Sequence, residues 1–308
     1  MITIERPGML ALLQDLGRPG LAHLGVAPSG AWDRDAHTRA NALVGNLASA
    51  ATIELLHGGL ELRTRHLAFV ALVGPGVRLW VDGLQLALER PHALVPGARL
   101  TVETRGAEES ENRTAGFRSY LAVAGGFDVP STFGSRSRDT LAQLGPRPLS
   151  GGDELAVGRF DTGRSLPGHV PGGRSSAGQP SDDQSQSSRA FEVLPSPVAD
   201  HAPAEVLSAV ASQTWRVSSS SDRIAVRLLG DPVEHRRPEV AVQPLVPGAI
   251  QLPPSGQPII FGPDHPLTGG YPVIGVLTQA SLARFAQSRP GDQVALSWSS
   301  PKGSAPQL

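Results

Sequence analysis

The feature that most constrains the fold is a series of short apolar or alternating runs separated by turns that contain glycine and proline. Runs of about four to eight residues have the length of β-strands, whereas globular helices usually need about ten or more. The pattern therefore predicts a mainly β protein of barrel or sandwich type, and not a doubly wound α/β sheet. The runs lie at Leu67 to Gly74, Val77 to Gly83, Ala98 to Thr104, Arg118 to Gly126, Phe191 to Leu194, Trp215 to Ser218, Ile224 to Gly230, Pro258 to Gly262, Pro272 to Leu277 and Gln293 to Trp298.

Only a few short helices are predicted. The clearest lies within Trp32 to Asn46, where alanine, leucine and valine form one apolar stripe, Asp33 is a suitable N-cap and Gly45 a suitable stop. Two shorter helices are predicted near Ala204 to Ala211 and near Gln279 to Gln287. Glycine (35) and proline (28) disfavour long helices throughout this chain of 308 residues.

One segment, Thr162 to Arg189, consists almost entirely of glycine, serine, proline, glutamine and aspartate. It offers little apolar surface to offset the entropy lost on ordering. We therefore predict a flexible linker at 162–189 between a first domain, 1–161, and a second, 190–299, with a C-terminal tail at 300–308. The two β-rich halves suggest a tandem arrangement, although no residue-level repeat demonstrates duplication.

Composition and patterning exclude several classes of function. The formal net charge is −1, so no basic field attracts nucleic acid or anionic lipid. The absence of cysteine excludes disulfides, zinc–thiolate sites and a cysteine nucleophile. The histidines do not show metal-site spacing, so no metal is expected. No apolar run is long enough to span a membrane, and no signal-peptide pattern is present, so we expect a cytoplasmic protein.

The first candidate binding region runs from Gln14 to Asn46 and leads into the predicted helix. Its glycine-rich loop carries polar side chains, among them Asp15, Arg18, Ser29 and Asp33. They fit either a loop held by aspartate–backbone and aspartate–arginine bonds or a substrate-binding loop.

A second candidate region, Gly125 to Thr140, leaves a strong predicted strand. Gly134, Ser135 and Arg136 form a turn that could present backbone N–H groups and a guanidinium to an anion or carboxylate. An arginine that simply ties down the loop is an equally good interpretation.

The third candidate region, Val246 to Val276, combines prolines and glycines with Asp264, His265, Thr268 and Tyr271. Rigid polar loops between strands are common places for binding and catalytic sites. The alternative is a turn that only packs two strands.

These segments, with others, resemble the biotin-dependent carboxyltransferase family, which is also labelled allophanate hydrolase subunit 2. The resemblance covers residues 1–160 and 190–298 and implies a pair of cyclophilin-like β-barrels. The motifs that carry it are QDLGRPG, PSGAWD, ANALVGN, RSYLAVAGG, FGSRS, LSGGDEL, SDR, PGAIQLPPSGQPI and TGGYPVIGV.

The resemblance also implies a function. Within this family the chain most resembles the C subunit of an ATP-dependent 5-oxoprolinase, which converts 5-oxoproline to glutamate together with its A and B subunits. ATP would be used by the complete complex. One alternative is a urea carboxylase-like carboxyltransferase, with biotin supplied by another chain because this one has no biotin-carrier sequence. Another is a non-catalytic regulatory subunit that antagonises a kinase inhibitor.

Carried over to this chain, the resemblance implies two sets of site residues. Arginine would hold a carboxylate or acyl-phosphate oxygen, and Thr268 with the following backbone would donate hydrogen bonds to an oxyanion. The expected catalytic residues are Arg136, Arg223, Asp264, Thr268 and Tyr271. The expected substrate-binding residues are Ser29, Asp33, Ser135, Gly269 and Gly270.

Overall fold

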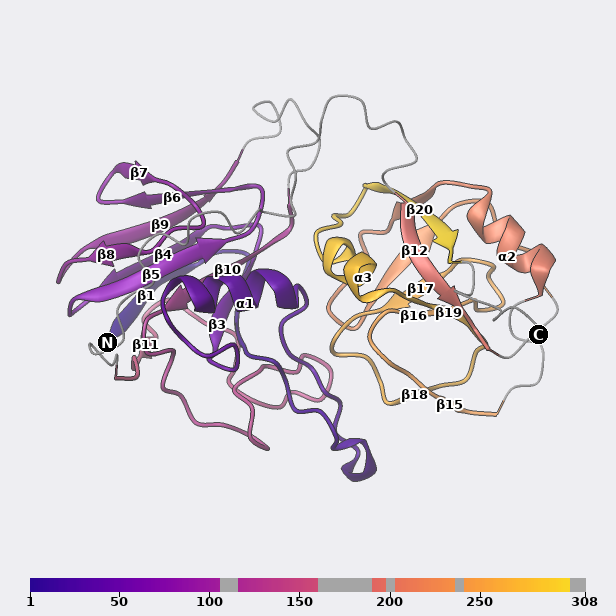
Figure 1. Cartoon of the computed structure of the whole chain (residues 1–308), viewed down its shortest axis with the longest axis horizontal. Coiled ribbons are helices and arrows are strands. Elements are labelled where there is room, and N and C mark those ends of the chain that lie inside the picture. The colour runs from indigo at the N-terminus through magenta and orange to yellow at the C-terminus, as the bar shows by residue number, and fades with distance from the viewer. Residues whose placement is uncertain (106–115, 160–189, 198–202, 236–240, 300–308) are drawn as a thin grey trace, which may run out of the picture. The chain divides into compact units, whose positions relative to one another are not determined.

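The computed structural model describes residues 1–105, 116–159, 190–197, 203–235 and 241–299 (Figure 1). The chain divides into two compact units, Met1–Pro171 and Gly172–Leu308. The expected linker at 162–189 and the expected tail at 300–308 lie outside the described residues, so the domain boundaries remain a prediction.

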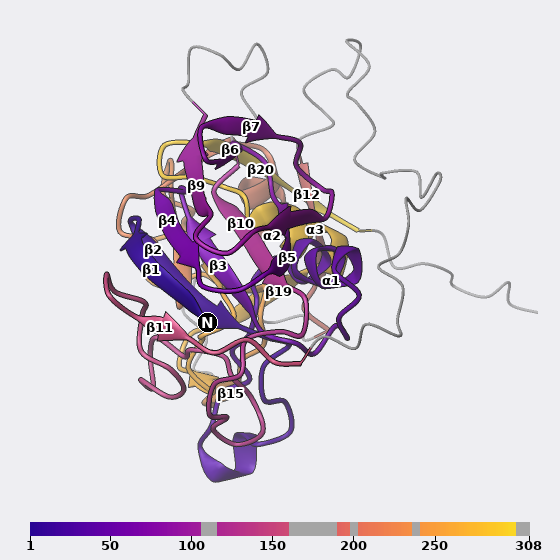
Figure 2. The same ribbon diagram turned by 90° about the vertical axis from the view of Figure 1, so that its left-hand side faces the viewer.

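The first unit contains two antiparallel sheets. The six-stranded sheet has the order β11-β1-β4-β9-β6-β7, and Figure 2 shows its strands β1, β4, β9 and β6 side by side. The five-stranded sheet has the order β2-β3-β10-β5-β8. The strands are β1 (Ile2–Pro7), β2 (Leu10–Gln14), β3 (Thr52–Leu56), β4 (Leu60–Thr64), β5 (Ala68–Val73), β6 (Val77–Val81), β7 (Leu84–Leu86), β8 (His92–Leu94), β9 (Arg99–Thr104), β10 (Arg118–Val123) and β11 (Glu154–Leu155).

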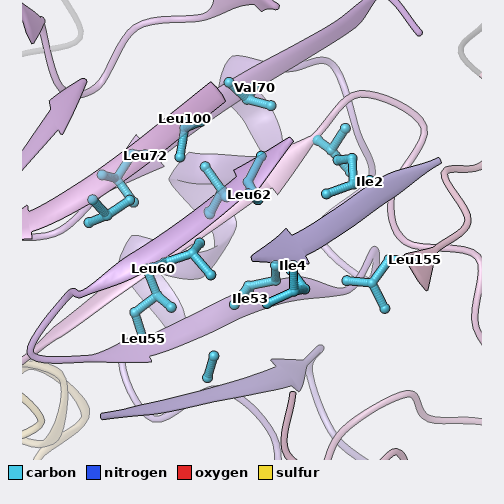
Figure 3. Close-up of a cluster of buried hydrophobic side chains, with 14 of the residues drawn as sticks. Ile2, Ile4, Ile53, Leu55, Leu60, Leu62, Val70, Leu72, Leu100 and Leu155 are labelled. Carbon is cyan, nitrogen blue, oxygen red and sulfur yellow. The ribbon is translucent and has the colours of Figure 1, made fainter. Parts of the chain in front are cut away.

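The two sheets share one apolar core. Ile4 and Leu62 of the six-stranded sheet and Ile53 and Leu72 of the five-stranded sheet are fully buried in the same cluster (Figure 3). Alternate residues on β4, such as Glu61, point the other way, because side chains on a strand alternate between its two faces. The core therefore fixes which face of each sheet is available for polar groups.

The helix α1 (Arg34–Leu43) covers the other face of the five-stranded sheet. The Asp33 carboxylate accepts a hydrogen bond from the Ala36 N–H at 2.9 Å, which confirms Asp33 as the N-cap. Gly45 follows the helix with a φ of 74°, a conformation that glycine adopts at little cost. Buried alanines of α1 pack against Tyr120 of β10.

The second unit contains a closed barrel with the strand order β12-β19-β16-β17-β14-β13-β20. Strands β12 and β20 pair in parallel, and the other neighbours pair antiparallel. A separate two-stranded ribbon joins β15 and β18. The strands are β12 (Ala190–Pro195), β13 (Trp215–Val217), β14 (Ala225–Leu229), β15 (Gln243–Pro244), β16 (Ala249–Gln251), β17 (Ile259–Phe261), β18 (Thr268–Gly269), β19 (Val273–Leu277) and β20 (Gln293–Trp298).

The prediction of a mainly β chain with a few short helices is confirmed. Besides α1, the described residues contain α2 (Ala204–Ala211), α3 (Gln279–Phe285) and the 3-10 turn η1 (Ala22–Leu24). Each strand predicted above overlaps a strand of the structure. Within the described part of the chain, no helix has both the length and the apolar character needed to cross a membrane.

Candidate functional site

In the first unit, the buried carboxylate of Asp15 joins two loops that are distant in sequence. Its Oδ1 accepts hydrogen bonds from the Gly17 N–H at 2.7 Å and from the hydroxyls of Ser135 and Ser137, both at 2.6 Å. Its Oδ2 accepts one from the Arg136 N–H at 2.6 Å. The first two candidate regions therefore form one structure, with the hydroxyl of Ser135 used to build it.

Arg18 adds further links between the same loops. Its Nε donates to the Thr132 carbonyl at 3.3 Å, and its Nη2 donates to the Ser137 carbonyl. The hydroxyl of Ser29 donates to the Arg138 carbonyl at 3.1 Å, which gives Ser29 a similar role. We define the Asp15 cluster as Asp15, Arg18, Ser29, Ser135 and Ser137. Hydrogen bonds across such a cluster hold both loops in one conformation.

Arg136 is the expected catalytic residue that the structure places beside this cluster. Its Nε donates to the Val129 carbonyl at 2.8 Å, and its Nη2 lies 3.8 Å from Oδ1 of Asp128. The side chain is 36% exposed, so the guanidinium is accessible to an anionic ligand as well as tied to its loop. Both interpretations offered from the sequence therefore remain compatible with its position.

A buried polar network lies beneath the start of α1. The Tyr120 hydroxyl donates to Oε2 of Glu54 at 2.8 Å and accepts from the Asp33 N–H at 2.8 Å. Glu54 also accepts from the Trp32 N–H at 3.1 Å. Burial raises the pKa of Tyr120 well above its usual range, so its hydroxyl keeps its proton and acts as a donor. Burial also lowers the pKa of the nearby His37, which favours the neutral imidazole.

Glu54 and Tyr120 were not among the residues expected from the sequence. One signal in the sequence could have identified Glu54: in the run TIELL a carboxylate stands next to apolar residues of a strand. A charge buried in this way needs hydrogen-bonding partners nearby. Asp33, which was expected to bind substrate, has one carboxylate oxygen engaged as the helix cap. These contacts fix where the first candidate loop meets α1.

In the second unit, two of the expected catalytic residues bind each other. The Arg223 guanidinium donates to both oxygens of Asp264, through Nε at 2.9 Å and Nη2 at 3.2 Å. Their side chains are 4% and 0% exposed. A bidentate, buried pair of this kind holds its loops firmly, and removal of one partner leaves a buried charge.

The remaining candidates follow Asp264 along one loop. Thr268 and Gly270 are exposed, and Gly269 and Tyr271 are half-buried. Gln251 of the barrel donates through Nε2 to the Tyr271 carbonyl at 2.8 Å. A Cβ at Gly269 would lie 2.4 Å from Nε2 of Gln251, so a side chain there would have to displace the end of the Gln251 side chain. The loop is thus anchored at both ends, and Thr268 between them is exposed.

The expected residues therefore fall into two groups. Ser29, Asp33, Ser135 and Arg136 belong to the first unit, and the others belong to the second.

Among the described residues, no group of three or more histidine or carboxylate side chains could hold a metal ion. A surface hollow of about 490 Å³ lies elsewhere in the first unit, against Trp80 and Arg99.

Comparison with known proteins gives these two groups a context. The family described as "Carboxyltransferase domain, subdomain A and B" matches residues 24–298. The chain is 32% identical over 291 residues to the C subunit of 5-oxoprolinase from Escherichia coli, an alignment that covers 93% of this chain and 87% of that protein. It is 29% identical over 314 residues to urea amidolyase of Saccharomyces cerevisiae, covering 95% of this chain but 16% of that protein.

A solved structure agrees with these relationships. The crystal structure of TTHA0988 superposes with a TM-score of 0.77 at 31% sequence identity, covering 96% of this chain and 55% of that one. The chain therefore spans about half the length of that protein, and a much smaller part of urea amidolyase. A family match over most of the chain, together with this fold, establishes that the protein belongs to the carboxyltransferase family of subdomains A and B.

Proposed function

We propose that the chain is the C subunit of a multi-subunit, ATP-dependent 5-oxoprolinase that acts in the cytoplasm with its A and B subunits. The complete complex converts 5-oxoproline, ATP and water to glutamate. The observation that carries this proposal is the similarity to the C subunit of the Escherichia coli 5-oxoprolinase, which extends over nearly the whole of both chains. ATP is a substrate of the complex, and its binding is not assigned to this chain.

Within that complex, the loop from Asp264 to Tyr271 contributes hydrogen-bond donors to the reacting group. The buried Arg223–Asp264 pair holds the start of the loop, and Gln251 holds its end. The Thr268 hydroxyl and the backbone beside it are the donors for an oxyanion. Such donors are effective because they are held in place before the reaction begins.

Arg136 and the Asp15 cluster supply a second, independent binding element in the first unit. The partly exposed guanidinium is the group for a substrate carboxylate, since arginine and carboxylate match in charge and geometry. Ser29, Asp33 and Ser135 hold the loops that carry it rather than offering free side chains.

The second candidate function is transfer of a carboxyl group from carboxybiotin, with biotin carried by another chain. It is favoured by the similarity to urea amidolyase, at 29% identity over 95% of this chain. Biotin-dependent turnover of urea by an assembled complex would select this candidate.

The proposal is tested by coexpression with candidate A and B subunits. We expect ATP-dependent release of glutamate from 5-oxoproline by the complete mixture and none by this chain alone, whose sequence shows no motif for a self-contained nucleophile and base. Full activity of the A and B subunits without the chain, or turnover by the chain alone, would contradict the proposal. Assembly without any turnover would favour a regulatory binding subunit.

A substitution tests the role of the loop in the same assay. Thr268→Ala in the assembled complex should lower kcat by about 100- to 1000-fold, the usual loss for one oxyanion donor. Tyr271→Phe tests the phenol in the same way. Ser255→Ala, which removes another exposed hydroxyl of this unit, is the matched control and should keep full activity. Normal kcat in both loop variants would remove this loop from the chemistry.

A further inference from the structure

Gly270, in the loop that begins at Asp264, has a backbone N–H that donates no hydrogen bond to any described residue. Gly270 is exposed, and a Cβ added to it would meet open space. The residue before it is already engaged, because Gly269 pairs with Gln243 in the ribbon of β15 and β18 (Figure 1). The Gly270 N–H is therefore a backbone donor of this loop that a ligand can use.

One side chain of the barrel, Gln251, contacts both neighbours of Gly270. Its Nε2 donates to the Tyr271 carbonyl at 2.8 Å. A Cβ added to Gly269 would collide with the same nitrogen. The φ of Gly269 lies outside the left-handed region, so the contact with Gln251, and not the backbone conformation, is what favours glycine there. Gln251 thus limits the backbone on each side of the Gly270 N–H.

Gln251 is itself held firmly by the barrel. It ends β16, is 3% exposed, and pairs with Ile259 of β17 and with Val273 of β19. The register between β16 and β19 shifts between Ile250 and Gln251, an irregularity of the kind that re-aims side chains. The amide that contacts the loop therefore has a rigid support.

We propose that Gln251 is a positioning residue for the reaction, which holds the backbone around Gly270 so that the Gly270 N–H meets the developing oxyanion. This inference rests on the proposed function and narrows its backbone donors to one named group. A donor fixed before the reaction stabilises the charge of the transition state without having to reorganise. Loss of Gln251 should therefore affect the chemical step more than substrate binding.

Two single variants and their combination test this inference in the assembled complex, with glutamate release as the assay. Gln251→Ala removes the amide, and Gly269→Ala adds a Cβ that displaces it. Each should lower kcat by about 100-fold with little change in KM, as when a reacting group is misplaced by about 1 Å. The double variant should lose no more than Gln251→Ala alone, because the added Cβ then has room.

The matched control is Gln213→Ala. Nε2 of Gln213 also donates to a backbone carbonyl of the second unit, that of Asp231 at 3.1 Å. This variant should keep the wild-type kcat. The Tm of every variant should fall by a few degrees at most, since each loses the hydrogen bonds of a single side chain.

Each other outcome overturns the inference in a distinguishable way. Wild-type kcat in both single variants would overturn it and leave the proposed function standing. A loss in the double variant equal to the product of the two single losses would also overturn it, because the two defects would be unrelated. A large fall in Tm with a normal kcat at lower temperature would make Gln251 a structural residue only. Absence of glutamate release by the wild-type complex would overturn the proposed function and this inference together.

Discussion

Replacing Asp264 with alanine is expected to lower the free energy of unfolding of the second unit by about 3–5 kcal/mol. The reason is that Arg223, which is 4% exposed, would keep its charge in the protein interior without the carboxylate that binds it through two nitrogen atoms. Thermal or urea unfolding of the purified chain measures the effect, and no partner subunit is needed.

Two further variants test whether the cost of Asp264→Ala comes from the buried charge that Arg223 keeps. A double substitution, Arg223→Met with Asp264→Leu, removes both charges and should cost less than Asp264→Ala alone, since no uncompensated charge remains. Arg289→Ala breaks a weaker pair in the same unit, where Nε lies 3.8 Å from Asp292 and the side chains are 24% and 35% exposed. It should cost less than about 1 kcal/mol.

The result also decides how Asp264 contributes to activity. If Asp264→Ala kept its full stability but lost turnover in the complete complex, the carboxylate would act on the substrate and not through Arg223. The expected loss of stability instead assigns the pair to positioning the loop that begins at Asp264. Thr268, which is exposed, and Tyr271 then remain the hydroxyl-bearing side chains of that loop to be tested for a role in the chemistry.

Much of the fold could be predicted from the sequence because strands carry local signals. Runs such as Arg118 to Gly126 are apolar, short and bounded by turn residues, and each corresponds to a strand. The strands β1 and β4 were not predicted, although Leu60 and Leu62 alternate with Glu61 and Arg63 in the pattern of a half-buried strand. Strands β1 and β4 could have been predicted by counting alternation of apolar and charged residues as a strand signal, as well as continuous apolar runs.

The candidate site was less predictable because its contacts join distant segments. The sequence placed Asp15 and Ser135 in separate candidate regions, yet their side chains meet at 2.6 Å across 120 residues. It likewise treated Arg223 and Asp264 as two catalytic groups, and the structure joins them in one buried pair. Residue type and spacing indicate which groups are polar and lie in loops, but not which of them satisfy one another.

Replacing Asp15 with alanine is expected to lower the free energy of unfolding of the first unit by about 4 kcal/mol or more. The substitution removes the acceptor for four hydrogen bonds, from the N–H groups of Gly17 and Arg136 and the hydroxyls of Ser135 and Ser137. Each buried donor left without a partner costs about 1–3 kcal/mol, and some of the hydroxyls can turn to other acceptors. Urea unfolding of the chain measures the loss.

Asp128→Ala is the matched control, because Asp128 is a carboxylate of the same region that is 68% exposed and lies 3.8 Å from Arg136. Its removal should change stability by less than about 1 kcal/mol. An Asp15→Ala variant as stable as Asp128→Ala would show that the two loops hold together without the cluster. Since Asp15 also holds the backbone of Arg136, Asp15→Ala should lower turnover of the assembled complex even at temperatures where the variant is still folded. Turnover that stayed at the wild-type level would show that the position of Arg136 does not depend on this cluster.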